Sequence, residues 1–274
     1  MKVSLLQMNS VSDKTVNLAT ARTLIERAVA QDGPDWVLLP EVFDYMGGDR
    51  QSKRAAAEVL PNGPAYTMLQ ELAAKHRIVI HAGSILEALP HDDRLHNTTL
   101  VFGRDGRELA RYRKIHLFDI TTPDGVDYKE STAIKPGDAV VTYDCEGVTV
   151  GCAICYDLRF PALFQALADK GATMIALPAA FTMQTGKDHW DVLCRARAIE
   201  TETYFCAAAQ TGAFQQGNEI RHTYGNSLVV DPWGLVVARA SDGPGLVSAR
   251  IDPARVDKVR AMIPVARHRV PLPI

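Results

Sequence analysis

The chain has 274 residues, of which 47% are hydrophobic and 23% are charged. This composition is typical of a globular protein with a substantial core and excludes an intrinsically disordered chain. Thirty Lys and Arg residues nearly balance thirty-two Asp and Glu residues, so the formal net charge is −2, and the sequence contains no basic run. A nucleic-acid partner is therefore not expected.

The sequence also bears on the compartment. The N-terminal residues MKVSLLQMNS contain an apolar run that is too short for a secretory signal. No apolar stretch approaches the roughly 18 residues that a membrane span needs. The five cysteines are an odd number without the pattern of a disulfide framework, which is typical of a reducing compartment. We expect a cytoplasmic protein with no membrane partner.

The first half of the chain alternates between apolar runs and helical patterns. Apolar runs typical of buried strands occupy residues 2–8, 35–41 and 78–85. Apolar residues at helical spacing predict helices over residues 12–33 and 64–76, and the first of these begins at a Ser12/Asp13 cap and stops at Gly33. Residues 97–114 then read as a hairpin that turns at Arg-Asp-Gly.

The second half repeats the alternation. Strands are predicted at residues 148–157, 173–181, 204–212 and 245–252, and helices at 160–172, at 187–203 and from Pro253. A second hairpin is predicted over residues 224–240, with its turn at Pro-Trp-Gly. Because no repeat or linker divides the chain, we predict a single domain over residues 1–274, an α/β fold with two mixed sheets face to face between helical layers. The proline-rich tail, about residues 264–274, is expected on a surface at a subunit interface.

Three polar residues stand at the ends of apolar runs, where α/β proteins collect functional groups. Glu41 ends WVLLPE, Lys114 follows ELARYR, and Cys155 ends VTVGCAIC. Taken singly, these are usually a solvated turn acid, a charged surface edge and a core cysteine. Taken together, they supply a thiol nucleophile, a base for its proton and a cation for the negative charge that develops.

The sequence around these residues resembles the nitrilase, or carbon–nitrogen hydrolase, superfamily. Its Glu–Lys–Cys blocks correspond to LLPEVF, RYRKIHLFD and GCAICYDLRFP, in the family's order. The segments MNS, PAAF, HWDVLCRARAIE, VVDPWG and P-x-x-x-H-R extend the resemblance over essentially the whole chain. The resemblance implies a four-layer α-β-β-α sandwich in which Glu41 is the general base, Cys155 is the nucleophile and Lys114 stabilises the tetrahedral intermediate.

A redox or zinc C-x-x-C is the alternative interpretation of Cys152 and Cys155. Residues three apart on a strand point to opposite faces, and no second C-x-x-C lies nearby, so we expect neither a disulfide nor a metal site. Cys152, Cys194 and Cys206 are predicted to pack in the core. Cys145 is predicted to lie in a turn without a function.

Further site residues follow from the resemblance. The backbone N–H of Tyr156 is expected to share the oxyanion with Lys114. Glu130, in DYKES, matches a second family glutamate, which implies that it orders Lys114 or the hydrolytic water, with an exposed loop acid as the alternative. Asp157 and Arg159 are predicted to pair and hold the turn.

Other candidates lie around the helix predicted over residues 187–203. Phe181 and Thr182 follow a strand and are expected to line the substrate site. His189 is a further candidate there, although a hydrogen-bonded packing role is preferred because the triad already contains a base. Arg195 and Arg197 lie two apart on the helix, so at most one, assigned here as Arg197, should reach the pocket, with Glu200 or Glu202 pairing with the other. Residues 221–223 are predicted to lie in a loop, as a cation for a substrate carboxylate or as a solvated segment.

The resemblance implies a cysteine-dependent amidase that converts a small carboxamide to a carboxylate and ammonia through a thioester, without metal or organic cofactor. The segments HWDVLCRARAIETETYFCAAAQTG and VVDPWGLVVARASDGPGL look most like the deaminated glutathione amidase branch. An ω-amidase acting on 2-oxoglutaramate or succinamate, a nitrile hydrolase and an N-carbamoyl hydrolase are the alternatives, and a non-catalytic binding module is the alternative from another class. A homodimer, or a larger homo-oligomer, is also implied.

Overall fold

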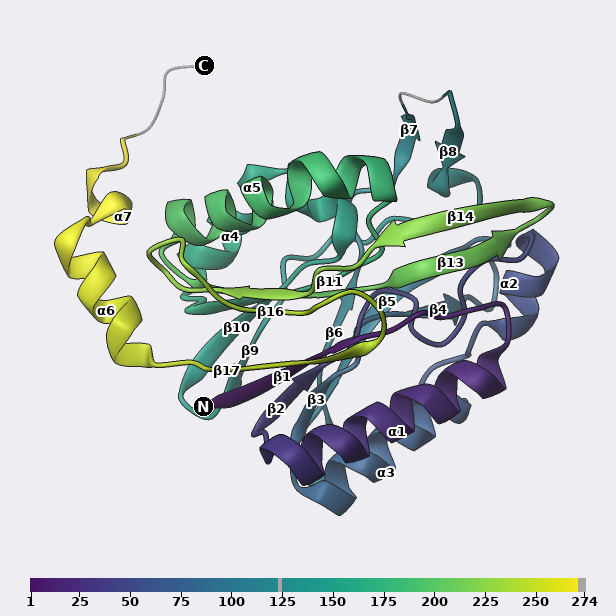
Figure 1. Cartoon of the computed structure of the whole chain (residues 1–274), viewed down its shortest axis with the longest axis horizontal. Coiled ribbons are helices and arrows are strands. Elements are labelled where there is room, and N and C mark those ends of the chain that lie inside the picture. Colours follow the sequence, from purple (N-terminus) through teal and green to yellow (C-terminus); the bar gives the residue numbers. More distant parts are fainter. Residues whose placement is uncertain (123–124, 271–274) are drawn as a thin grey trace.

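Two mixed sheets form the centre of the structure, a computed structural model that describes residues 1–122 and 125–270 (Figure 1). The first sheet runs in the order β17-β1-β2-β3-β5-β4, and β6 pairs with β5. Its strands are β1 (Lys2–Gln7), β2 (Trp36–Leu38), β3 (Val79–His81), β4 (Ile85–Ala88), β5 (Leu95–Phe102), β6 (Glu108–Arg113) and β17 (Gly245–Arg250). β1, β2 and β3 are parallel, so their carboxyl ends lie at one edge of the sheet.

The second sheet runs in the order β16-β15-β12-β11-β10-β9. Its strands are β9 (Thr142–Cys145), β10 (Val148–Cys152), β11 (Met174–Ala179), β12 (Tyr204–Ala209), β15 (Leu228–Val230) and β16 (Val236–Arg239). β10, β11 and β12 are parallel, and β15 and β16 form the predicted hairpin around Pro-Trp-Gly. Cys145 therefore ends a strand and is buried, which corrects its prediction as a turn residue.

Helices cover the outer faces of both sheets. Figure 1 shows α1 (Lys14–Asp32) and α3 (Pro64–His76) on one side, and α4 (Pro161–Asp169) and α5 (Met183–Thr201) on the other. α1 is capped by Asp13 and ends at Gly33, which has φ 56°, as predicted. The four-layer α-β-β-α arrangement is thereby confirmed. The remaining helices are α2 (Arg50–Ala56), α6 (Pro253–Met262) and α7 (Val265–His268).

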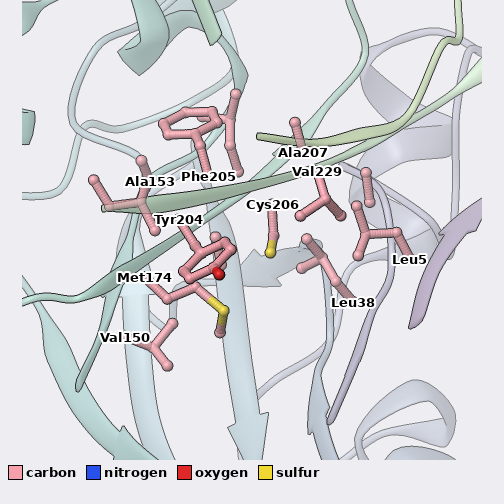
Figure 2. Packing of buried hydrophobic residues seen from close by; sticks show 14 of the residues in the cluster. Leu5, Leu38, Val150, Ala153, Met174, Tyr204, Phe205, Cys206, Ala207 and Val229 are labelled. Atoms are coloured by element: carbon pink, nitrogen blue, oxygen red, sulfur yellow. The ribbon is translucent and has the colours of Figure 1, made fainter. Parts of the chain in front are cut away.

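The main core lies between the two sheets. Leu5 and Leu38 of the first sheet face Val150, Met174 and Cys206 of the second, and Figure 2 shows these side chains packed together. Fully burying one such side chain contributes roughly 1.5–3 kcal/mol. The core therefore holds the two sheets, and the turns at their ends, in a fixed relative position.

Two small antiparallel ribbons project beyond the main sheets. They are β7 (Asp119–Thr121) with β8 (Asp127–Lys129), and β13 (Thr211–Gln216) with β14 (Glu219–Tyr224). Residues 221–223 therefore belong to a strand, and the prediction of a loop is wrong. The hairpin was missed because β13 and β14 carry mainly polar side chains and are largely exposed, so no apolar alternation marks them.

Several predicted boundaries differ from the structure. The predicted strand over residues 78–85 divides into β3 and the start of β4, and α5 begins at Met183 rather than at residue 187. β2 ends at Leu38 and β10 at Cys152, so Glu41 and Cys155 each lie three residues beyond a strand. Boundaries of this kind depend on tertiary contacts more than on local pattern.

The C-terminal part of the chain packs against the second helical layer. Arg269 pairs with Asp169 at the end of α4, with the guanidinium Nη2 and the carboxylate Oδ1 2.5 Å apart. Residues 271–274 of the predicted tail lie outside the described residues. The single domain over residues 1–274 stays a prediction. In the part of the chain that the structure describes, no helix has the length and apolar character needed to cross a membrane.

Candidate active site

Glu41, Lys114 and Cys155 come together from three distant segments of the chain. The Lys114 Nζ atom lies 2.9 Å from the Glu41 Oε1 atom, and both residues are buried, with exposed fractions of 2% and 4%. The Glu41 carboxylate lies close enough to the Cys155 thiol to raise the pKa of that thiol. All three residues line one pocket of about 440 Å³.

The turn after β10 presents the Cys155 thiol. The strand ends at Cys152, and the short 3-10 helix η2 (Cys155–Arg159) begins at the cysteine itself. Cys155 has φ 47°, in the left-handed region that a residue with a side chain rarely adopts. Such strain persists only where the surrounding contacts impose it, and it is concentrated at functional sites.

The charges around the thiol determine its resting state. Burial raises the pKa of the Cys155 thiol well above its usual value, and the Glu41 carboxylate raises it further, against the opposing effects of the Lys114 ammonium and a backbone hydrogen bond from Ala180. The thiol is therefore protonated at neutral pH. A protonated thiol needs a base before it can act as a nucleophile, and the Glu41 carboxylate is the acidic group that affects its pKa.

Lys114 is held between two carboxylates. Its Nζ atom lies 2.9 Å from Glu130 Oε2 and 3.1 Å from Glu130 Oε1, in addition to its contact with Glu41. Burial alone would lower the pKa of Lys114, but Glu130, Glu41 and Cys155 raise it well above the usual value. Glu130 is itself held by the backbone N–H of Phe118, at 2.6 Å. Lys114 is therefore a permanent cation beside the sulfur.

A buried carboxylate links the segment that carries Lys114 to the turn that carries Cys155. Asp157 accepts hydrogen bonds from the Tyr112 hydroxyl (2.7 Å), the backbone N–H of His116 (3.1 Å) and the backbone N–H of Ile154 (2.8 Å). The His116 ring Nδ1 lies 2.7 Å from the same carboxylate. Tyr112 and His116 stand two residues before and after Lys114.

The prediction that Asp157 pairs with Arg159 is wrong. The oxygens of Asp157 are occupied by the neighbouring segment, and the Arg159 Nη2 atom instead lies 3.2 Å from His189 Nδ1. The Arg159 guanidinium also lies 5.7 Å from the ring centroid of Phe181. A pair two residues apart in a tight turn is a weaker constraint than four donors from two segments.

Two polar residues behind the base were not predicted. The Asn97 side-chain amide donates to Glu41 Oε1 at 2.8 Å, and the Gln210 side-chain amide donates to the Glu41 backbone carbonyl at 2.9 Å. Both residues are buried. A buried Asn in the strand pattern LHNTTLVF was the available signal, because an unpaired amide is costly in a core.

The structure places the remaining predicted residues in two groups. Tyr156, Phe181 and Thr182 line the pocket, as do the side chains of residues 221–223. Among the residues described, neither His189 nor Arg197 lines it.

His189 and Arg197 have other contacts. His189 is exposed on α5 beside Arg159. Arg197 is buried under α5, where its Nε donates to the Leu158 carbonyl (2.9 Å) and its Nη1 pairs with Glu200 (2.9 Å). Assigning Arg197 to the substrate site was therefore wrong, because the chosen arginine faces α4 and η2 rather than the cavity.

We call Glu41, Asn97, Lys114, Glu130 and Cys155 the pocket floor, and Arg50, Lys53 and Arg221 the pocket rim. Arg50 and Lys53 come from α2 and Arg221 from β14, and all three line the pocket. Burial lowers the pKa of Lys53, and Arg221 lowers it further, against the opposing effects of Glu130 and Asp49. Figure 1 shows the β13–β14 hairpin reaching toward α2, and the Gly48 N–H donates to the Gln215 carbonyl at 3.1 Å.

The cysteines show no sign of pairing. All five are free thiols, and Cys152 is fully buried in the core between the sheets. Over residues 1–122 and 125–270, no group of three or more His, Cys, Asp and Glu side chains is placed to hold a metal ion.

Comparison with known proteins gives matches over nearly the whole chain. A deaminated glutathione amidase of Synechocystis sp. is 41% identical over 269 residues, covering 97% of this chain and 96% of the relative. An omega-amidase of Saccharomyces cerevisiae is 36% identical over 273 residues, covering 98% of this chain and 92% of the relative.

Solved structures agree with the sequence matches. A Saccharomyces cerevisiae protein described as a member of branch 10 of the nitrilase superfamily has a TM-score of 0.86 at 34% identity, covering 97% of this chain and 94% of that one. The Caenorhabditis elegans NitFhit protein has a TM-score of 0.90 at 39% identity, and this chain covers 64% of its length. Residues 2–261 match the family described as carbon-nitrogen hydrolase. With this match and relatives of such similarity, the chain belongs to the carbon–nitrogen hydrolase family.

Proposed function

We propose that the protein is a cysteine-dependent amidase that hydrolyses a small carboxamide to a carboxylate and ammonia. The observation that carries this proposal is that Glu41, Lys114 and Cys155 line one pocket, with the Lys114 ammonium 2.9 Å from the Glu41 carboxylate and both charges close enough to affect the pKa of the thiol. A nucleophile, a base and a fixed cation in one pocket are what acyl transfer requires. The names of the relatives, deaminated glutathione amidase and omega-amidase, are consistent with this chemistry.

Acylation begins when Cys155 attacks the amide carbon. The thiol proton passes to Glu41 as the sulfur–carbon bond forms, and the carbonyl oxygen takes up the negative charge. The Lys114 ammonium and the backbone N–H of Tyr156 stabilise that oxyanion. Glu41 then returns the proton to the amide nitrogen and the carbon–nitrogen bond breaks. Ammonia departs from a primary amide, or an amine from a substituted amide such as deaminated glutathione, and a thioester remains on Cys155.

Deacylation uses the same base. Glu41 takes a proton from a water molecule as the water oxygen attacks the thioester carbon. The tetrahedral intermediate again places its oxyanion beside Lys114, and its collapse breaks the carbon–sulfur bond. The proton on Glu41 returns to the sulfur, and the product carboxylate departs. Glu130 keeps Lys114 charged and oriented through both halves of the cycle.

The pocket rim favours a substrate that carries a carboxylate of its own. Within residues 1–122 and 125–270, no carboxylate lies within ion-pair distance of Arg50 or Lys53. Arg221 also lines the pocket, where it pairs with Glu219 at 3.0 Å and stacks over Tyr128. Charge complementarity therefore favours an amide that carries a carboxylate, and the similarity to a deaminated glutathione amidase favours deaminated glutathione, with 2-oxoglutaramate or succinamate as the alternative. A nitrile or an N-carbamoyl compound is compatible with the pocket floor, but it gives no reason for the positive charges of the pocket rim.

The test is hydrolysis of five substrates: release of the amine fragment from deaminated glutathione, and release of ammonia from 2-oxoglutaramate, succinamate, a nitrile and an N-carbamoyl amino acid. Wild-type protein should hydrolyse at least one anionic amide, and Cys155→Ala should reduce kcat by at least about 10³-fold, the scale on which a lost nucleophile acts. Cys152→Ala is the matched control, because Cys152 is buried three residues away and outside the pocket. No hydrolysis of any substrate, together with thiol alkylation no faster than that of free cysteine, would favour the binding-module alternative.

We also propose a cytoplasmic homodimer that buries the outer face of α5. Large apolar side chains are exposed on α5 and on the neighbouring β15–β16 hairpin, including Val192 (66%), Leu235 (55%) and Trp233 (42%). Contiguous apolar exposure of this kind marks interaction surfaces. Sedimentation velocity of wild-type protein and of Val192→Glu tests this: a monomeric wild type would contradict it.

A further inference from the structure

Asn97 is the third residue of β5 and hydrogen-bonds Glu41, the proposed base. Its exposed fraction is 2%, and its side-chain amide nitrogen donates to Glu41 Oε1 at 2.8 Å. Its backbone carbonyl accepts from the backbone N–H of Lys114 at 2.9 Å. One residue of the first sheet therefore contacts both charged members of the proposed triad.

The other end of this amide is unsatisfied. Among the described residues, the buried Asn97 Oδ1 atom has no hydrogen-bond partner. A buried polar atom without a partner destabilises a protein, and an apolar side chain of the same shape would avoid that cost. The packing of β5 therefore does not explain an asparagine at this position. The hydrogen bond that its amide nitrogen donates to Glu41 explains it.

Glu41 uses its two oxygens differently because of this contact. Oε1 accepts from both Lys114 and Asn97, at 2.9 Å and 2.8 Å. Among the described residues, no side chain hydrogen-bonds Oε2, and the carboxylate lies close enough to Cys155 to raise the pKa of its thiol. We infer that Asn97 is a positioning residue that keeps Oε1 occupied, so that Oε2 is the oxygen that takes the Cys155 proton.

The contacts of Lys114 show why its ammonium alone does not keep the Glu41 carboxylate in position. An ammonium has three N–H donors, and Lys114 Nζ already contacts Glu41 Oε1 and both oxygens of Glu130. When an oxyanion forms, one of these donors turns toward it. The Asn97 amide carries no such second task, so it holds the Glu41 carboxylate in place while Lys114 changes partner. This role rests on the proposed function, in which Glu41 is the base.

Two substitutions test the role. Asn97→Leu keeps the approximate shape and removes the donor, and Asn97→Asp is isosteric but places a second carboxylate against Glu41. Both should lower kcat about 10–100-fold with KM changed less than about 3-fold, because the base is misplaced while the substrate contacts remain. The acid limb of the kcat/KM profile should move to higher pH, since the donor favours the charged carboxylate.

Thr98→Val is the matched control. Thr98 is the next residue on β5, is fully buried, and donates to Glu87 at 2.7 Å rather than to the triad. This variant should be less stable to heat than the wild type but should keep kcat within about 3-fold, because it loses a buried hydrogen bond without touching the base.

Alkylation of Cys155 by iodoacetamide gives a readout that needs no turnover. Its pH profile should shift in the Asn97 variants as the kcat/KM profile does, and it should be unchanged in Thr98→Val. A folded Asn97→Leu protein with wild-type kcat and an unshifted alkylation profile would overturn the inference, as would failure of both Asn97 variants to fold, which would assign a structural role. An inactive wild type would refute the proposed function separately, and the alkylation profile would still decide the role of Asn97.

Discussion

The pocket floor and the pocket rim are built in different ways. The floor residues are held by buried hydrogen bonds from the ends and middles of sheet strands, as in the contacts of Lys114 with Glu41 and Glu130. The rim residues Arg50, Lys53 and Arg221 come from a short helix and a projecting ribbon; Arg50 is exposed, and the other two are only partly buried.

The difference separates the proposed chemistry from the proposed selectivity. A floor that is fixed by the core between the sheets keeps reacting atoms within the tolerance that acyl transfer needs. A rim on peripheral elements can change its charges without disturbing that geometry. Substitutions on the floor should therefore change kcat, and substitutions on the rim should change KM.

Of the substitutions that separate floor from rim, the largest effect is expected from removing Asp157, whose carboxylate joins the segments that carry Lys114 and Cys155. Asp157→Ala leaves the donors of Tyr112, His116 and Ile154 without their shared acceptor. We expect a loss of about 3 kcal/mol in the free energy of unfolding, and a fall in kcat of about 10²-fold, because Lys114 and Cys155 lose their common anchor. Urea unfolding and steady-state kinetics measure the two effects.

Asp144→Ala is the control for that substitution. Asp144 is an exposed aspartate on β9 of the second sheet, and its carboxylate accepts a hydrogen bond only from Thr149 among the contacts described for it. Its removal should leave both quantities nearly unchanged. If Asp157→Ala keeps wild-type kcat, the proposed anchoring of the floor is incorrect.

A smaller effect is expected at the rim. Arg221→Gln and Lys53→Met should each raise KM about 10-fold for an anionic amide, with kcat nearly unchanged, because each removes one charge from the substrate carboxylate. Arg54→Gln, on the same helix as Lys53 but exposed and outside the pocket, is the control. A neutral amide should show no difference among these variants; an equal rise in KM for neutral and anionic amides would count against a carboxylate site.

The smallest effect on turnover is expected behind the floor, at Asp44. Burial raises the pKa of Asp44 to about 7, with Lys14 opposing the shift from 3.1 Å. The folded state therefore binds more protons than the unfolded state between about pH 4 and 7. Asp44 should weaken stability progressively as pH rises through that window, by a total on the order of 4 kcal/mol.

Asp44→Asn should remove this part of the pH dependence and change kcat less than about 2-fold, because the carboxylate does not line the pocket. Thermal melting temperatures of wild type and variant at pH 5 and pH 8 measure it. If the melting temperatures of wild type and variant change by the same amount between pH 5 and pH 8, Asp44 does not titrate in that range.

Much of the scaffold was predictable because its patterns are local. Apolar runs located the buried strands, and a cap and a terminal glycine located α1 almost to the residue. The two predicted hairpins also formed, since Arg-Asp-Gly and Pro-Trp-Gly are strong turn signals. The β13–β14 hairpin lacked such alternation, and so its place at the pocket was missed.

The sequence by itself determined the strand-and-helix order, the family resemblance and the three segments that carry Glu41, Lys114 and Cys155. Tertiary structure alone decided that Asn97 and Asp157 support those segments, that Arg197 turns away from the cavity and that α2 and β14 supply the rim. The physical reason is range: periodicity and turn signals act over a few residues, whereas these contacts join residues far apart in the chain and depend on how two sheets pack.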